Sequence, residues 1–164
     1  MKKTILLSVF SAALLLMSIS CSKDEVPELT ERNVPQAIIQ GKVWADLNVT
    51  LPGYENAPTG TQIMAQVWTG DLMPIEDEAF VHTYQSYEAN VDGSGNYSVS
   101  VDATTEGLNV RFIMDDFEYN QVQGTNPADS SQIPPKRKIY SAFDLSVGVV
   151  AGKTTIKDIY YDTF

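Results

Sequence analysis

The chain has 164 residues, of which 21 are acidic and 11 are Lys or Arg, and its formal net charge is -10. That length is typical of one domain, and the negative charge argues against nucleic acid as a partner, because phosphate binding depends on clustered basic residues. The single Cys excludes an intrachain disulfide scaffold, and the single His excludes a multi-histidine metal site.

The first 20 residues have the organisation of an export signal. Two lysines open it, and residues 5–17 are apolar apart from two serines. This stretch is shorter than the roughly 20 apolar residues of a membrane-spanning helix. Small Ser18 and Ser20 stand just before Cys21, where the composition becomes polar. We therefore expect cleavage at Cys21.

This junction resembles the cleavage site of bacterial lipoproteins, although Ser18 stands where that family usually has Leu. The resemblance implies that Cys21 carries acyl chains such as palmitate and anchors the protein in the outer membrane. Lys23, Asp24 and Glu25 resemble the short acidic signal of lipoproteins displayed on the surface of some Gram-negative bacteria. Ordinary signal-peptidase cleavage after Ser20 is the alternative, and the leaflet that holds the anchor stays open.

Residues 21–36 predict a flexible tether that follows the lipidated Cys. They are polar, contain two prolines and four acids, and offer too little apolar surface to stabilise an ordered structure. Because an anionic chain is repelled by anionic lipid head groups, membrane attachment depends on the acyl chains.

Residues 37–164 predict one β-sandwich domain, since apolar and polar side chains alternate with a period of two. The predicted strands are 37–47, 61–69, 80–91, 97–102, 108–119, 138–150 and 154–161. For the strand 138–150 the predicted inward set is Ile139, Phe143, Leu145, Val147 and Val149. Seven such strands, joined by glycine-containing turns, predict an antiparallel Greek-key sandwich in which Gly95 takes a positive φ.

Three segments carry a family resemblance, and one of them is the small-residue stretch APTGT at 57–61. The segment Gly41-Lys42-Val43 and the stretch VDGSGNYSV at 91–99 resemble the carboxypeptidase regulatory-like domains, which have the transthyretin (prealbumin) fold. The resemblance implies an accessory or binding module without catalytic residues. The long predicted strand 80–91 departs from the shortest family pattern and leaves the sheet order open. An immunoglobulin-like sandwich is the alternative, although the Cys-Trp-Cys pattern of that fold is absent.

Three acidic stretches are candidates for chemistry. Asp92, Ser94 and Asn96 have the alternating oxygen spacing of a calcium loop, but Ala103 stands where such a loop has a bidentate Glu, so a hairpin turn explains them as well. The acids at 76–78 and at 115–118 could supply the carboxylate pair of a glycoside hydrolase, yet the sequence fixes no such pair across a cleft.

Trp44 and Trp68 each follow a predicted core valine, so they point away from the core unless the long loops cover them. Outward aromatic rings can stack on sugars. His82 has no nucleophile motif to serve and is interpreted as a strand histidine.

If every connection reverses direction, the loops 48–60, 92–96 and 120–137 lie at one end of the sandwich, opposite the start of the first strand. They would gather acids and aromatic side chains into a calcium or ligand site. The candidate residues are Tyr54, Glu55, Asp92, Asn96, Asp116, Glu118, Tyr119 and Asp129.

We expect a non-catalytic, lipid-anchored binding or assembly module at the outer membrane, with a glycan or a protein as partner and no cofactor. A calcium-dependent glycan-binding domain in polysaccharide capture is the alternative from another class, and a hydrolase is a third. Outward tryptophans favour glycans, a compact acid cluster favours calcium, and hydrolysis requires two opposed acids in a cleft.

Overall fold

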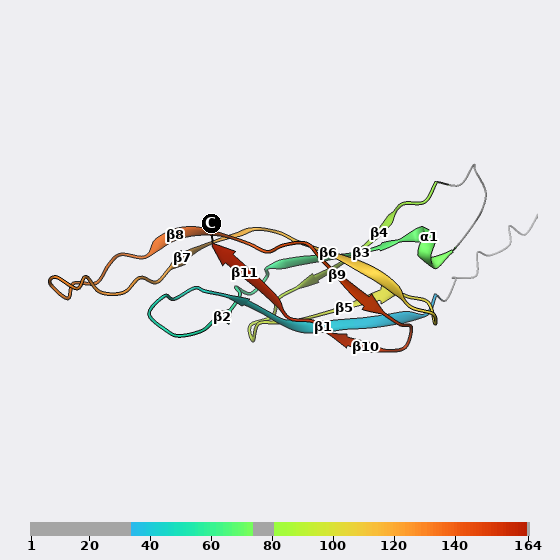
Figure 1. Cartoon of the computed structure of the whole chain (residues 1–164), viewed down its shortest axis with the longest axis horizontal. Coiled ribbons are helices and arrows are strands. Elements are labelled where there is room, and N and C mark those ends of the chain that lie inside the picture. Colours follow the sequence, from blue (N-terminus) through green and yellow to red (C-terminus); the bar gives the residue numbers. More distant parts are fainter. Residues whose placement is uncertain (1–33, 74–80, 164) are drawn as a thin grey trace, which may run out of the picture. The chain divides into compact units, whose positions relative to one another are not determined.

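The computed structural model of the chain describes residues 34–73 and 81–163, which form an all-β sandwich of two sheets (Figure 1). The predicted fold class is therefore confirmed. Several predicted features lie outside the described residues, namely the predicted export signal, Cys21, most of the predicted tether and the acids at 76–78. Within the described ranges, the structure contains no helix with the length and apolar character needed to cross a membrane.

The larger sheet has the order β10-β1-β11-β8-β7, with β2 and β5 also paired to β1, and the smaller sheet has the order β4-β3-β6-β9. The strands are β1 (Gln36–Ala45), β2 (Glu55–Asn56), β3 (Gln62–Trp68), β4 (Tyr84–Asn90), β5 (Asn96–Asp102), β6 (Leu108–Met114), β7 (Phe117–Gln121), β8 (Lys136–Ser141), β9 (Leu145–Val149), β10 (Thr154–Ile156) and β11 (Ile159–Thr163). One short helix, α1 (Thr69–Leu72), follows β3.

Alternate residues of the strands fill the space between the two sheets. On β3 the side chains of Ile63, Ala65 and Val67 are fully buried, as the period-two pattern predicts. Between the sheets, the rings of Tyr97 on β5 and Phe112 on β6 meet edge to face, with centroids 6.1 Å apart. Burial of each large apolar side chain stabilises the sandwich by about 1.5–3 kcal/mol.

The predicted strand 108–119 is in fact two strands, because the chain changes sheets at Asp115 and Asp116. β6 belongs to the smaller sheet and β7 to the larger one. The hydroxyl of Tyr161 donates to the Asp115 carbonyl oxygen at 3.1 Å, and the Phe117 ring stacks on Tyr140 at 5.0 Å. These contacts hold the corner, and both acids remain exposed.

The predicted strand 138–150 is also two strands, β8 and β9, which lie in different sheets. The predicted inward orientation is wrong for Ile139 and Phe143, which are 52% and 78% exposed. Tyr140 is fully buried instead, and its hydroxyl donates to the Asp46 carbonyl oxygen at 2.6 Å. The physical reason is that a strand that moves from one sheet to the other does not keep its inward phase. The inward positions of Val147 and Val149 on β9 are confirmed, and Leu145 is half-buried.

The wholly antiparallel arrangement is wrong, because β1 pairs in parallel with both β10 and β11. The predicted strand 154–161 keeps one register against β1 but is interrupted at Lys157 and Asp158.

The interruption depends on Gly41 in β1. A Cβ atom at Gly41 would lie 2.0 Å from the Lys157 carbonyl oxygen, so a side chain has no room there. The same carbonyl accepts a hydrogen bond from the buried Tyr97 hydroxyl at 2.7 Å, and the Lys42 amide donates to Asp158 Oδ1 at 2.8 Å. Burial raises the pKa of the Tyr97 hydroxyl, which therefore stays protonated and able to donate. We call these four groups and Gly41 the β10–β11 junction.

We predict that Gly41→Ala lowers the free energy of unfolding by about 3 kcal/mol, because the new methyl group must push the Lys157 carbonyl away from Tyr97. Urea denaturation of the purified protein measures the change. Gly148→Ala on β9 is the matched control, since the nearest atom to its added Cβ lies 3.8 Å away. We expect the control to change stability by less than about 1 kcal/mol. Equal losses in the two variants would contradict the role of the junction.

Candidate functional site

The outer face of the larger sheet carries a row of aromatic side chains. Val43 and Ala45 point into the core, so Trp44 between them points outward. Tyr160 of β11 is the register partner of Trp44, which places both side chains on the same face of neighbouring strands. Tyr160 is 51% exposed, and Trp44 is partly exposed.

Tyr54, from the loop before β2, joins this row. Its ring meets the Tyr160 ring edge to face with centroids 5.4 Å apart. Lys42 lies two residues before Trp44, and its Nζ atom is 5.1 Å from the centroid of the Trp44 ring. We call Trp44, Tyr54 and Tyr160 the aromatic strip.

A surface hollow of about 470 Å³ adjoins the strip through Lys42, which lines the hollow and lies over the Trp44 ring. Its lining comes from β1, β5, the last residues of β4 and β10, the turn 92–96 and the β10–β11 junction. The exposed polar side chains in it include Gln40, Lys42, Asn96, Ser98 and Asp158. Amide, hydroxyl, ammonium and carboxylate groups therefore stand beside aromatic rings, a combination that suits a polar ligand with an apolar face.

The turn 92–96 forms one wall of the hollow, and its own hydrogen bonds hold it rigid. Asp92 Oδ1 accepts from the amides of Ser94 and Asn96, both at 2.8 Å, and these bonds hold the pKa of Asp92 below its ordinary value of 3.8. Gly95 has a φ of +78°, as predicted, and its Cα packs against the Asn56 side chain. The hairpin interpretation of this turn therefore accounts for both carboxylate oxygens of Asp92.

The loops 48–60, 92–96 and 120–137 point toward the same end of the sandwich, away from the start of β1 (Figure 1). Two of them are joined directly, because the Val49 amide donates to the Val122 carbonyl oxygen at 3.2 Å. The predicted acids nevertheless do not form one cluster. Among the described residues, no group of three or more His, Cys, Asp or Glu side chains is placed to hold a metal ion.

Each predicted acid of the long loops is used locally. Glu55 Oε2 accepts from the amides of Leu47 and Asn48, at 2.8 and 3.2 Å. Asp129 accepts from the Ser131 amide and hydroxyl, which holds the pKa of Asp129 below its ordinary value. Asp116 is exposed at the β6–β7 corner. Glu55 and Asp129 therefore stabilise their own loops.

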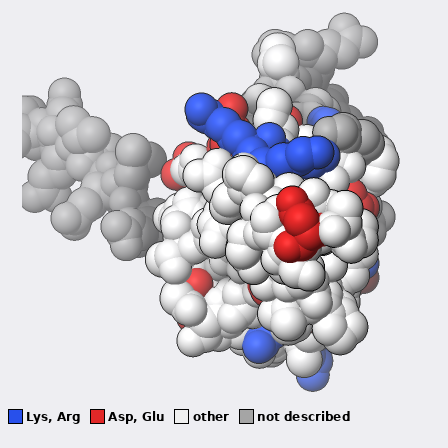
Figure 2. Space-filling model, turned by 90° about the vertical axis from the view of Figure 1, so that its left-hand side faces the viewer, with Lys and Arg blue, Asp and Glu red and all other residues white. Residues whose placement is uncertain are grey.

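Glu118 and Tyr119 lie in β7, away from the first hollow. Glu118 forms an ion pair with Arg137 of β8, and these residues with Tyr119 and Asn120 line a second cavity of about 430 Å³. β8 opens with three consecutive basic residues at 136–138, and Figure 2 shows Lys and Arg side chains gathered at this end of the molecule.

Trp68 projects from the outer face of the smaller sheet, so the two tryptophans occupy opposite outer faces of the sandwich.

Of the predicted residues, the structure brings together Trp44, Tyr54, Asp92 and Asn96. Sequence reasoning missed Tyr160, although it alternates with buried Ile159 and Tyr161. That alternation was the signal that could have found it.

The hollow contains two carboxylates, Asp92 and Asp158, and both are hydrogen-bonded to backbone amides. A glycoside hydrolase needs one carboxyl group with a raised pKa to act as general acid. Because the pKa of Asp92 is lowered, Asp92 does not supply that acid.

No family model matches the chain, and no curated protein matches it. Among solved structures, the chain is similar to the major plantain pollen allergen Pla l 1, with 12% identity over 78% of this chain and 94% of that chain, and a TM-score of 0.37. It is also similar to GBS52, the minor pilin of the Gram-positive pathogen Streptococcus agalactiae. That match has 9% identity, a TM-score of 0.39 and coverage of 80% of this chain and 46% of the pilin chain.

We predict that Asp92→Asn makes stability less sensitive to acid. A carboxyl whose pKa is lowered by folding stabilises the fold above its unfolded pKa, and this contribution is lost as the pH falls through the folded pKa. The difference in unfolding free energy between wild type and variant should therefore shrink below about pH 5 and stay constant above it. Urea denaturation at several pH values between about 2.5 and 7 measures this difference, because carboxyl groups titrate within that range. A constant difference throughout would contradict the assignment.

Proposed function

We propose that the chain is a non-catalytic, lipid-anchored module that binds neutral glycans on the outer face of its larger sheet. The observation that carries the proposal is the aromatic strip of Trp44, Tyr54 and Tyr160 beside the hollow. Glycans suit this surface because a sugar ring has an apolar C–H face and a periphery of hydroxyl groups. Aromatic rings contact the apolar face, and fixed polar groups form hydrogen bonds with the hydroxyl groups.

The polar groups beside the strip can both donate to and accept from sugar hydroxyls. Gln40 and Asn96 have amide side chains, and Ser98 has a hydroxyl group. Asp158 is held by the Lys42 amide, which leaves its second carboxylate oxygen for a ligand hydroxyl. The sheet already holds these polar groups in place. A ligand that bonds to them displaces water, and the protein loses little conformational entropy.

The charges of the site disfavour an anionic ligand. The hollow contains two carboxylates, Asp92 and Asp158, against the single ammonium of Lys42. The whole chain has a formal charge of -10, which repels polyanions at long range. This mode of binding uses no calcium, and both Asp92 oxygens accept hydrogen bonds within their turn.

Two sequence features support the rest of the proposal. Cys21 follows an apolar export signal, which favours a lipid anchor at the outer membrane or cell surface. The motifs that resemble carboxypeptidase regulatory-like domains, Gly41-Lys42-Val43 and the stretch 91–99, border the hollow and favour an accessory binding role over catalysis.

We predict that Tyr160→Ala weakens binding to neutral polysaccharide at least about 5-fold, because truncation of a central aromatic contact costs more than about 1 kcal/mol. Affinity electrophoresis of the purified protein through gels with mixed-linkage β-glucan, xylan or mannan measures the association. The matched control is Tyr119→Ala, which removes another exposed tyrosine and should leave the retardation unchanged.

Retardation lost equally in both tyrosine variants, or absent in wild type with all three polysaccharides, would sink the glycan proposal. A gel series with EDTA and with added calcium separates the alternatives. Retardation that requires calcium would favour the calcium-dependent glycan-binding domain instead.

We predict that Cys21→Ala releases the protein from membranes and abolishes fatty-acid labelling, since Cys21 is the single thiol of the chain. Fractionation of cells grown with a labelled fatty acid measures both effects. Ser22→Ala, next to the junction, is the matched control and should stay in the membrane fraction. If the Cys21 variant partitions like wild type, the lipoprotein assignment is wrong.

A further inference from the structure

The outer face of the smaller sheet carries its own pair of aromatic side chains. Trp68 at the end of β3 and Tyr84 at the start of β4 are register partners, so they project from the same face. They are 37% and 48% exposed, and their ring centroids are 5.0 Å apart. An exposed, contiguous pair of rings of this kind is typical of a contact surface.

The backbone is shaped to hold the Trp68 indole in place. A Cβ atom at Gly70 would lie 2.5 Å from Trp68 Nε1, so the indole packs against a bare Cα. The His82 ring lies 6.0 Å from the Trp68 ring, and the Thr83 amide donates to Thr69 Oγ1 at 2.9 Å. The indole is therefore positioned before any ligand arrives, which reduces the entropy lost on binding.

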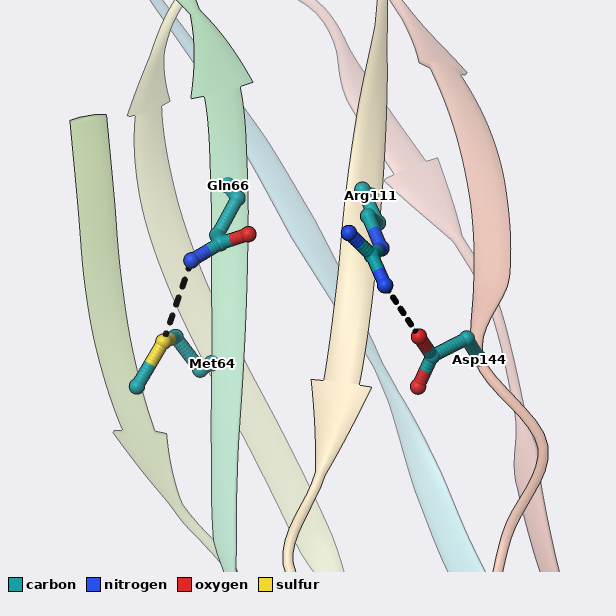
Figure 3. Close-up of polar contacts among 4 residues, drawn as sticks. All are labelled: Met64, Gln66, Arg111 and Asp144. Carbon is teal, nitrogen blue, oxygen red and sulfur yellow. Dashed lines mark hydrogen bonds and ion pairs between the residues drawn. The ribbon is translucent and has the colours of Figure 1, made fainter. Parts of the chain in front are cut away.

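Polar side chains lie next to the ring pair. Two residues back along β3, about 7 Å away, Gln66 is flanked by Ser86 of β4 and Arg111 of β6. Figure 3 shows Gln66 and Arg111 projecting from these neighbouring strands, with Arg111 bonded to Asp144 at 2.7 Å. Gln66 donates to Ser86 Oγ at 3.2 Å. Because Asp144 balances the Arg111 charge, this row presents fixed donors and acceptors with little net charge.

We propose that the face around Trp68 and Tyr84 is a second glycan-binding face, so that one module holds two glycan strands. The occupant is a neutral glycan, because the rings match the apolar side of a sugar and the charge-balanced row matches its hydroxyl groups. The two sheets bury their inner sides against each other, so one bound segment cannot touch both outer faces. The choice of ligand rests on the proposed function, but the second face is tested separately from the first.

The chain has two tryptophans, one on each face, and this makes their fluorescence a reporter for each face. The probes are hexasaccharides cut from mixed-linkage β-glucan, xylan and mannan, added to the purified full chain in detergent. In the Trp44→Phe variant, Trp68 is the sole reporter. Its emission should change saturably, and should still do so when Tyr160→Ala disables the first face. In the Trp68→Phe variant, Trp44 reports the first face alone.

Gly70→Ala tests the second face without the loss of a ring, since the methyl group displaces the indole. We expect at least about 5-fold weaker binding at this face, seen in calorimetry as a raised Kd for one of two sites. Gly124→Ala is the matched control, because its added Cβ meets nothing closer than 3.8 Å. Thermal melts exclude unfolding as the cause.

The outcomes separate the two proposals. A Trp44 response with a silent Trp68 overturns the second face and leaves the proposed function standing. A Trp68 response with a silent Trp44 supports the second face and overturns the first. Silence of both tryptophans with all three hexasaccharides overturns both.

Discussion

One missing side chain determines how the larger sheet is built. Because Gly41 has no Cβ, the Lys157 carbonyl can enter the sheet and bond to Tyr97, and the chain can bulge without losing register against β1. The bulge turns Asp158 toward the Lys42 amide and leaves Tyr160 level with Trp44. The hollow and the aromatic strip are both consequences of this close approach, so the stability of the sheet and the proposed binding depend on the same junction.

The alternation of side chains predicted the class of the fold and the inward faces of single strands, as Ile63, Ala65 and Val67 show. It failed where the chain changes sheets. Alternation with a period of two indicates which side chains share a face, but it does not indicate which sheet the strand belongs to. The corner at Asp115 is fixed by Tyr161, 46 residues away, and Tyr140 is buried through a bond to Asp46, 94 residues away. Such distant partners leave no local signal.

The candidate site, like the fold, could be predicted from the sequence only in part. Trp44 and Trp68 could be assigned outward from their neighbours in the sequence, whereas the hollow could not be found, since Asp92 and Asp158 lie far apart along the chain and meet only in the folded sheet. The prediction that three loops share one end was sound in direction, yet it did not show that Glu55 and Asp129 would be used to hold their own loops. Local hydrogen bonding competes with ligand binding for acids in loops, and spacing alone does not show which one prevails.

The parallel pairing of β1 with β11 also sets how the module responds to mechanical load. A pull on the chain that enters β1 at Gln36 acts along the strand, while a ligand held near Tyr160 restrains its neighbour. The ladder between them is then loaded in shear, so several hydrogen bonds must break together instead of one after another. With the proposed anchor ahead of β1 and the proposed glycan face on β11, a load on the module would therefore run along this ladder.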